Sequence, residues 1–159
     1  MDAFQAAVCF VLDAEGGQSN DPDDPGGLTR YGIAQASHPD VDVYHLTERA
    51  AIDLYRAQYW DPLHLDLLPS RIAVAVFDGA VQHGLRPSVR MLQDSVGTEP
   101  DGKLGPITVA ATQHRGGMDT LVGYCARRAV YYGHLPTFWK FGLGWNQRLL
   151  RLLLYTQSV

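Results

Sequence analysis

Residues 70–83 are the part of this chain that most constrains its fold. The segment reads Ser-Arg-Ile-Ala-Val-Ala-Val-Phe-Asp-Gly-Ala-Val-Gln-His, and it is apolar nearly all the way round at helical spacing. A surface helix has one apolar face, whereas a helix that is apolar on all sides has to be surrounded by other elements. We therefore expect a central buried helix here, with the rest of the chain packed around it.

The remaining sequence also carries helix signals almost throughout. Thr47 is placed to cap the helix that follows it, and Pro62 prevents that helix from continuing far. No segment has the pattern of a central strand, and hydrophobic residues make up 46% of the 159 residues, enough for a core. The further helices are expected at residues 2–14, 32–37, 48–60, 87–96, 106–114, 118–132 and 143–154. The sequence predicts a mainly α fold with a small irregular or β lobe at 16–30.

Composition argues against several classes of protein. No window approaches the roughly 18 to 20 uninterrupted apolar residues of a membrane span. No basic region precedes an apolar run at the N-terminus, so we expect no Sec signal peptide and synthesis in the cytoplasm. The isoelectric point is about 5.8 and no nucleic-acid-binding motif is present, so no nucleic acid partner is expected.

Charge is divided unevenly along the chain. Residues 1–101 hold 16 acidic and 6 basic side chains, a net charge of −10, whereas residues 102–159 hold 1 acidic and 7 basic, a net charge of +6. Residues 102–159 could present a basic surface to an anionic envelope or polymer. We favour the alternative, in which these basic side chains form a solvated face and pair with acidic side chains of residues 1–101. The residues concerned include Arg127, Arg128, Lys140, Arg148 and Arg151.

The sequence offers little sign of a metal site. Cys9 and Cys125 lie far apart within predicted helices, so we expect buried, reduced thiols rather than a disulfide. No Cys or His spacing resembles a zinc site. A calcium loop is an alternative for the oxygen-rich run 20–24, which lacks the spacing and terminal Glu of an EF-hand. We expect no metal and no cofactor.

Glu15 lies where an apolar helix meets a loop rich in Gly, Pro and Asp. At about 100° per residue it falls within about 20° of Phe4, on a stripe shared with Val8 and Val11. Apolar neighbours and the negative end of the helix dipole both disfavour the ionised form, which would raise the pKa of Glu15. A general acid needs this setting. The ordinary alternative is a solvated residue followed by a Gly-Gly helix cap.

Two further polar residues follow Glu15 in the loop region. Asp24 comes nine positions later and Thr29 five after that. The intervening residues are strong turn formers, which explains them without any function. A carboxylic acid, a second carboxylate and a hydroxyl gathered by a tight turn also suit glycosidic cleavage, in which one acid protonates the leaving oxygen and a second group holds or activates water.

Several segments, taken together and in order, resemble glycoside hydrolase family 108, whose members are N-acetylmuramidases found as phage endolysins and secretion-activator proteins. The segments of the first part are 15–17, 21–27, 29–33, 59–62, 77–78 and 81–84. Segments 92–97 and 101–108 resemble the peptidoglycan-binding half of the same proteins, and 141–148 resembles their C-terminal signature. The resemblance implies a lysozyme-like helical fold, with residues 1–84 as the catalytic region and 85–159 as a peptidoglycan-binding-like region packed on it.

The resemblance also implies a reaction. Glu15 would be the catalytic acid for the β-1,4 bond between N-acetylmuramic acid and N-acetylglucosamine in bacterial peptidoglycan. Asp24 or a neighbouring group would position or activate water, with Thr29 helping to hold it. Inversion is expected if the carboxyl groups are about 6.5 to 9.5 Å apart. The protein is expected to be a monomer that reaches the cell wall through a holin or by another route. Two alternatives stay open: a lytic transglycosylase, and a non-catalytic peptidoglycan-binding or secretion-assisting protein.

Five residues are candidates for substrate contact. Tyr31 lies in the loop region and offers a ring for sugar stacking. Gln82 stands where the family commonly has Asn, and keeps the amide on a longer arm. For His83 we favour the interpretation as a helix-end residue stabilised by the helix dipole; a substrate contact is the alternative. Asp101 and Lys103 form part of a turn, and their place in the peptidoglycan-binding resemblance makes them ligand candidates.

Asp78 has two interpretations. It shares a helical stripe with Val74 and Val81, so we expect it to be buried. It is either a second carboxylate in the cleft or a structural acid bonded to backbone amides, a Tyr or a Trp. We favour the structural role.

Overall fold

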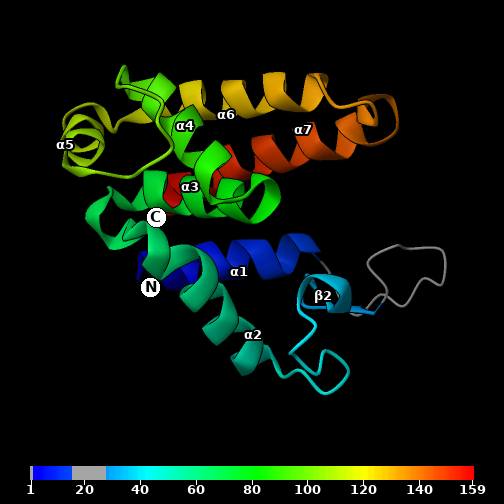
Figure 1. The fold of residues 1–159 in the computed structure, drawn as a ribbon. Coiled ribbons are helices and arrows are strands. Elements are labelled where there is room, and N and C mark those ends of the chain that lie inside the picture. Colours follow the sequence, from blue (N-terminus) through cyan, green and yellow to red (C-terminus); the bar gives the residue numbers. More distant parts are fainter. Residues whose placement is uncertain (1, 16–27) are drawn as a thin grey trace.

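The computed structural model describes residues 2–15 and 28–159, apart from the side chain of Glu15. The described part contains seven α-helices and one two-stranded antiparallel sheet (Figure 1). The helices are α1 (Ala3–Glu15), α2 (Glu48–Tyr55), α3 (Ser70–His83), α4 (Leu85–Val96), α5 (Pro106–Arg115), α6 (Met118–Gly133) and α7 (Phe138–Tyr155). Strands β1 (Thr29–Arg30) and β2 (Ile33–Ala34) follow α1. The predicted fold class, mainly α with a small lobe after the first helix, is confirmed.

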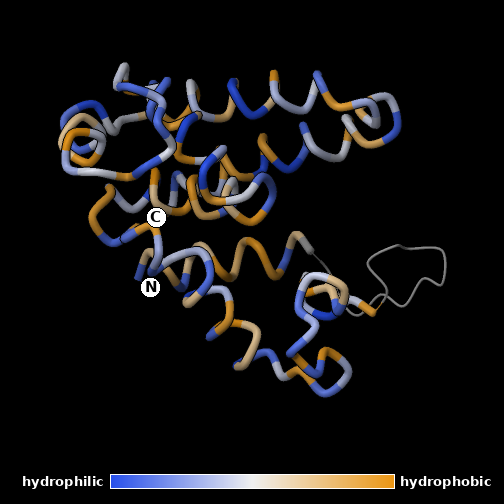
Figure 2. The backbone as a smooth tube through the Cα atoms, viewed as in Figure 1, coloured by the Kyte–Doolittle hydropathy of each residue, from blue (hydrophilic) through white to orange (hydrophobic). Residues whose placement is uncertain are grey.

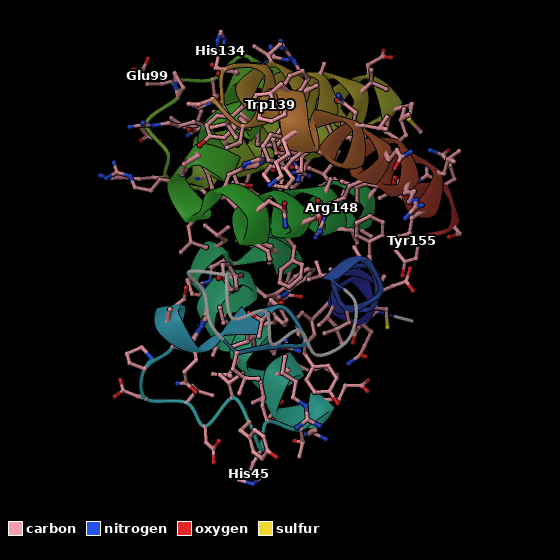
Figure 3. All side chains as sticks on the ribbon, turned by 90° about the vertical axis from the view of Figure 1, so that its right-hand side faces the viewer. His45, Glu99, His134, Trp139, Arg148 and Tyr155 are labelled. Atoms are coloured by element: carbon pink, nitrogen blue, oxygen red, sulfur yellow. The ribbon has the colours of Figure 1, made fainter. Side chains whose placement is uncertain are left out.

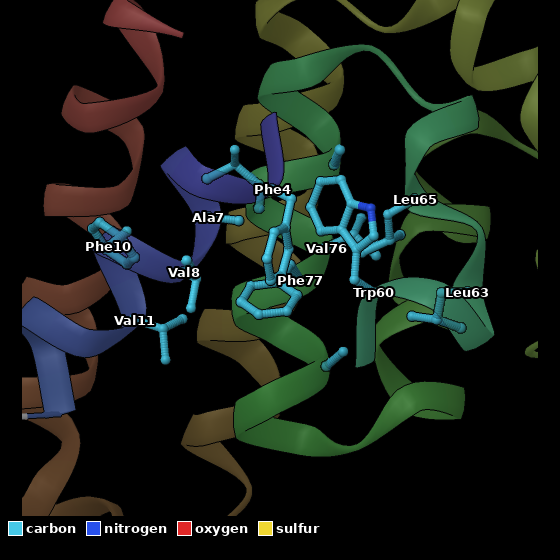
Figure 4. Close-up of a cluster of buried hydrophobic side chains, with 14 of the residues drawn as sticks. Phe4, Ala7, Val8, Phe10, Val11, Trp60, Leu63, Leu65, Val76 and Phe77 are labelled. Atoms are coloured by element: carbon cyan, nitrogen blue, oxygen red, sulfur yellow. The ribbon is translucent and has the colours of Figure 1, made fainter. Parts of the chain in front are cut away.

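Helix α3 lies at the centre of the molecule, as predicted. Every residue from Ile72 to Ala80 is buried, and α1, α4 and α6 pack against it. The ring of Phe77 meets the rings of Phe4 and Trp60 edge to face, with centroids 6.1 and 5.8 Å apart (Figure 4). Figure 2 shows hydrophobic and hydrophilic positions interspersed along the helices, as expected where each helix turns one face to the core.

Helix α1 buries the stripe on which Glu15 was predicted to lie. Phe4 is 3% exposed, and Val8 and Val11 are fully buried. Tyr155 of α7 donates a hydrogen bond from its hydroxyl to the carbonyl of Ala6 at 2.9 Å. Helices from both predicted regions thus pack on one core, and the division at residue 84 stays a prediction.

Helices α3, α4 and α6 approach one another at Gly79. The Ser88 hydroxyl donates to the Val76 carbonyl at 2.8 Å and lies 2.6 Å from the Tyr124 hydroxyl. A Cβ atom on Gly79 would overlap that Tyr124 hydroxyl. The close packing of these helices therefore requires a residue without a side chain at position 79.

We predict that Gly79→Ala lowers the free energy of unfolding by about 1 to 3 kcal/mol, because the added methyl group forces the helices apart. The matched control is Gly144→Ala in α7, where nothing lies within 4 Å of an added Cβ. That variant should gain about 0.5 to 1 kcal/mol, since Ala is the better helix former. Urea unfolding measures both, and an equal response of the two variants would contradict this packing argument.

Several predicted helix boundaries are wrong for local reasons. The helix capped by Thr47 ends at Tyr55 rather than near residue 60, and the chain continues as a π-helix, Arg56–Trp60. The cap itself is confirmed, because the Thr47 hydroxyl accepts from the Ala50 amide at 3.2 Å. Helix α4 begins two residues before Pro87, which is tolerated since first-turn amides have no partner in the helix.

The small lobe is a hairpin followed by a short helical turn. Thr29 pairs with Ala34, and Arg30 with Ile33. The two connecting residues, Tyr31 and Gly32, have φ values of 53° and 76°, the left-handed pair of a type I′ turn that matches the twist of a hairpin. The helix predicted at 32–37 is reduced to the 3-10 turn Gln35–Ser37.

The cysteines are free thiols. Cys125 is buried as expected, whereas Cys9 is exposed, so that part of the prediction is wrong. Among the described residues, no helix is long and apolar enough to cross a membrane, and no group of three or more His, Cys, Asp or Glu side chains could hold a metal ion. The alternative calcium loop at 20–24 lies outside the described residues.

Candidate active site

A cavity of about 550 Å³ lies where the C-terminal ends of α1 and α3 meet α7. Asp13 and Ala14 line it from α1, directly before Glu15, and Gln82 lines it from α3. Helix α7 supplies most of the remaining wall, namely Gly144, Trp145, Gln147, Arg148, Arg151 and Tyr155. Figure 3 shows Arg148 and Tyr155 on this side of the molecule. The cavity therefore joins the end of the first helix to the last helix of the chain.

Aromatic contacts hold α7 against α1 along this cavity. The rings of Phe10 and Tyr155 are 5.2 Å apart between centroids, and the Arg148 guanidinium lies 6.0 Å from the Phe10 ring centroid. Trp145 stacks on Tyr132 of α6 with ring centroids 4.8 Å apart. These contacts give the wall a fixed shape with both apolar rings and polar heads.

A smaller cavity of about 170 Å³ lies between the hairpin and α2. Gly32 and Ile33 line it from the hairpin, Tyr55 and Tyr59 from the α2 segment, and Val81 from α3. Val81 precedes Gln82, so the end of α3 contributes neighbouring residues to both cavities. The Tyr55 hydroxyl donates to the Tyr31 carbonyl at 2.9 Å, which holds the hairpin against α2.

Asp78 lies at the centre of a buried ion cluster behind the larger cavity. Its Oδ2 accepts from Nη1 of Arg128 at 2.7 Å, and its Oδ1 accepts from Nε and Nη2 of Arg148 at 2.9 and 2.7 Å. The side chains of Asp78 and Arg128 are 1% and 0% exposed, and that of Arg148 is 12% exposed. Burial alone would raise the pKa of Asp78, but the two guanidiniums outweigh it and hold the pKa below its usual value.

This cluster corrects two expectations. Asp78 is a structural acid, as favoured, but its partners are arginines rather than backbone amides, a Tyr or a Trp. The pairing of C-terminal basic residues with an acid of the first part is confirmed for Arg128 and Arg148. The solvated position expected of Arg128 is wrong, because its side chain is fully buried.

His83 takes part in the same cluster through Arg128. Nε of Arg128 donates to Nε2 of His83 at 3.1 Å, so that ring nitrogen carries no proton. Burial and the positive charge of Arg128 lower the pKa of His83 to about 4, against the opposing effect of Asp78. His83 is the last residue of α3, as predicted. The helix dipole is not the reason for its position, because the ring is neutral near pH 7 and accepts a hydrogen bond from Arg128.

We predict that this neutral histidine makes stability depend on pH. In the unfolded chain His83 has a pKa of 6.5 and binds a proton below that pH, whereas in the folded protein it becomes protonated only near pH 4. The free energy of unfolding should therefore fall as pH drops from about 6.5 towards 4. His83→Gln keeps an acceptor for Arg128 and should flatten this part of the profile. Urea unfolding at about pH 7 and about pH 5 measures the change.

The control for this prediction is His134→Gln, since His134 is exposed at the end of α6. That variant should retain the pH dependence of the unmodified protein. An undiminished fall in stability of the His83→Gln variant would contradict the role given to His83.

The other predicted site residues are dispersed. Thr29 and Tyr31 lie in the hairpin, half-buried, while Asp24 and the side chain of Glu15 lie outside the described residues. Gln82 lines the larger cavity. Asp101 and Lys103 lie beside α5, at the opposite end of the molecule from the hairpin (Figure 1).

Asp101 shapes the turn in which it was predicted to lie. Its Oδ1 accepts from Nε2 of Gln93 at 2.7 Å and from the Lys103 amide at 2.8 Å. The Gly102 amide donates to Oε1 of the same glutamine at 2.8 Å, and Gly102 has a φ of 77°. The turn interpretation is confirmed, and a ligand contact here stays a prediction.

The wall of the cavity on α7 was missed by the sequence reasoning. Arg148 and Arg151 were assigned to a solvated face, and Trp145, Gln147 and Tyr155 were not among the predicted site residues. One signal pointed to the C-terminal basic residues as a group: an acid within the apolar helix 70–83 needs a cation from elsewhere, and 7 of the 13 basic residues follow residue 101.

Comparison with known proteins identifies the family. Residues 8–84, which include α3 and the greater part of α1, match the model of glycosyl hydrolase 108. The solved structure of SagA from Brucella abortus is similar at 33% identity and a TM-score of 0.86, over 98% of this chain and 94% of that chain. No curated protein matches the chain significantly. The match to SagA covers nearly the whole chain, and the chain belongs to glycosyl hydrolase family 108.

Proposed function

We propose that this protein is a peptidoglycan hydrolase, an N-acetylmuramidase that cleaves the β-1,4 bond between N-acetylmuramic acid and N-acetylglucosamine. The observation that carries the proposal is the cavity of about 550 Å³ at the end of α1 in a member of a glycosyl hydrolase family. Glu15 is the last residue of that helix, and the two residues before it line the cavity.

Glu15 is proposed as the general acid that protonates the glycosidic oxygen. Its helix packs its apolar stripe in the core and ends beside the cavity. The negative end of the helix dipole, and the apolar neighbours that its place on this stripe predicts, would favour a carboxyl group that keeps its proton, which donation to the leaving oxygen requires. Asp24 is proposed to activate or position the water, with Thr29 helping to hold it.

The wall of the cavity supplies groups that suit a glycan. The amides of Gln82 and Gln147 can both donate and accept hydrogen bonds, as sugar hydroxyls and acetamido groups require. The rings of Trp145 and Tyr155 offer apolar surface for the faces of sugar rings. Tyr31 on the hairpin, with His83, Asp101 and Lys103, completes the set of proposed substrate contacts, although these lie outside the cavity wall.

The products of digestion test this proposal. Purified peptidoglycan is incubated with the protein, and the soluble fragments are reduced with borohydride and identified by mass spectrometry. A muramidase leaves reduced N-acetylmuramic acid at the new ends. Anhydro-sugar ends would show a lytic transglycosylase instead, and the absence of soluble fragments would favour a non-catalytic peptidoglycan-binding protein.

We further propose that the protein acts as an endolysin, made in the cytoplasm and released to the wall through a holin-type pore. Cells that express it should then stay intact until their membrane is permeabilised, and lyse promptly afterwards. Turbidity before and after chloroform treatment measures this, with cells expressing the Glu15→Gln variant as the control. Lysis without permeabilisation would contradict the proposed route.

A further inference from the structure

The larger cavity carries more positive charge than a neutral sugar needs. The ionisable residues of its wall, as far as the structure describes it, are Arg148, Arg151, Asp13 and Tyr155. Together with Asp78 and Arg128, which form an ion cluster with Arg148 behind this wall, the described side chains comprise three guanidiniums and two carboxylates. The N-acetylated sugars of a glycan strand are uncharged, because the lactyl carboxyl of muramic acid is bound to the peptide as an amide. A cationic wall points to a negatively charged substituent of the glycan.

Arg148 is held in place as part of this wall. Two of its nitrogens donate to the same oxygen of Asp78, at 2.9 and 2.7 Å, while Arg128 donates to the other oxygen. Among the residues that the structure describes, the cluster contains one negative and two positive charges, and His83 adds none near pH 7. Of Asp78, Arg128 and Arg148, only Arg148 lines the cavity. Its charge is fixed before a ligand arrives, which lowers the entropy lost on binding.

Arg151 lies three positions after Arg148, on the same face of α7. It is exposed, lines the cavity and forms no ion pair with any residue that the structure describes. A guanidinium binds a carboxylate through charge-assisted hydrogen bonds, in a geometry that an ammonium or an amide does not reproduce. Arg151 is therefore the cation of this wall best placed to take a new anionic partner.

We propose that this cavity binds a carboxylate of the peptide stem of peptidoglycan, with Arg151 as its main ligand and Arg148 as a fixed neighbouring charge. The inference rests on the proposed function and names the part of the substrate that the α7 wall recognises. Stem peptides are attached beside the bond to be cut and carry the negative charge of the polymer there. A cavity of about 550 Å³ has the size of an ordinary small-molecule site, large enough for residues of the stem next to a sugar.

Binding of a reaction product tests the inference without turnover. The ligand is the disaccharide N-acetylglucosaminyl-N-acetylmuramic acid with its peptide stem, which lacks the bond that a muramidase cuts. The comparison ligand is the same muropeptide after its carboxyl groups are converted to amides with carbodiimide and ammonia. Isothermal titration calorimetry of the unmodified protein should give about tenfold tighter binding of the carboxylate form.

The Arg151→Gln variant should bind the carboxylate form about tenfold more weakly and the amidated form unchanged. The matched control is Arg90→Gln, which removes an exposed arginine of α4 that is not part of the cavity wall. Its affinity for both ligands should equal that of the unmodified protein. Circular dichroism checks that both variants are folded.

Three results would overturn the inference: equal affinity of the unmodified protein for both ligands, an equal loss of both ligands in Arg151→Gln, or no binding of either. The proposed function fails separately. If the protein binds the carboxylate form selectively but releases no fragments from peptidoglycan, the muramidase proposal fails and the carboxylate-site proposal stands. Release of muramic acid ends without stem selectivity would do the reverse.

Discussion

Glu15→Gln is expected to reduce the hydrolysis of purified peptidoglycan by about 100-fold or more, because an amide of the same shape has no proton to donate to the leaving oxygen. The initial rate of clearing of a peptidoglycan suspension measures the effect. The loss should appear in the rate at saturating substrate rather than in binding, since Gln has the size and shape of Glu.

The matched control is Glu48→Gln, which makes the same substitution at an exposed position in the first turn of α2. That variant should clear peptidoglycan at the rate of the unmodified protein. Both variants are compared by thermal unfolding, so that a loss of activity is not a loss of fold. A folded Glu15→Gln variant with undiminished clearing would remove Glu15 from the mechanism.

The second large effect concerns stability. Asp78→Asn should lower the free energy of unfolding by about 3 to 5 kcal/mol, because removing one partner of a buried ion pair leaves the other charge uncompensated. The cost arises mainly at Arg128, since its side chain is 0% exposed and its unpaired charge would not be solvated by water. A domain of this size has only about 5 to 15 kcal/mol in total, so the variant should unfold at much lower urea concentrations.

Asp53→Asn is the control for this prediction. Asp53 forms an ion pair with Arg49 one helical turn away, but these side chains are 64% and 85% exposed. An exposed pair contributes about 0 to 1 kcal/mol, so the control should lose little. The double variant Asp78→Asn with Arg128→Gln should recover part of the lost stability by removing the buried charge. Equal stabilities of the Asp78 and Asp53 variants would contradict the importance given to the buried cluster.

Local patterns predicted much of this fold. Residues 70–83 form α3 with the bounds expected, because a segment apolar on every side has few other solutions. The Thr47 cap depends on its own neighbours alone and is also confirmed. The start of α7 was placed five residues late. Its N-cap residue, Thr137, makes no side-chain cap hydrogen bond, and the sequence Phe-Trp-Lys-Phe-Gly that follows lacks an acidic residue.

Of the candidate site, the part formed by local sequence could be predicted and the part formed by distant residues could not. The end of α1 could be predicted from the stripe that leads to Glu15 and from the Gly, Pro and Asp residues that follow. The α7 wall could not, because Asp78 meets Arg128 and Arg148 across 50 and 70 residues of sequence. Each of the seven basic residues after position 101 was an equal candidate for that pairing. Only the packing of α6 on α3, and of α7 on α6 and α1, selects two of them.

The most direct test of the proposed function is digestion of purified peptidoglycan in oxygen-18-labelled water. Hydrolysis adds the oxygen of water to the sugar at each new reducing end, whereas transglycosylation closes an anhydro ring and uses no water. We predict N-acetylmuramic acid ends that carry one labelled oxygen with the unmodified protein, and almost none with Glu15→Gln. Unlabelled anhydro ends, or no new ends at all, would contradict the proposed muramidase.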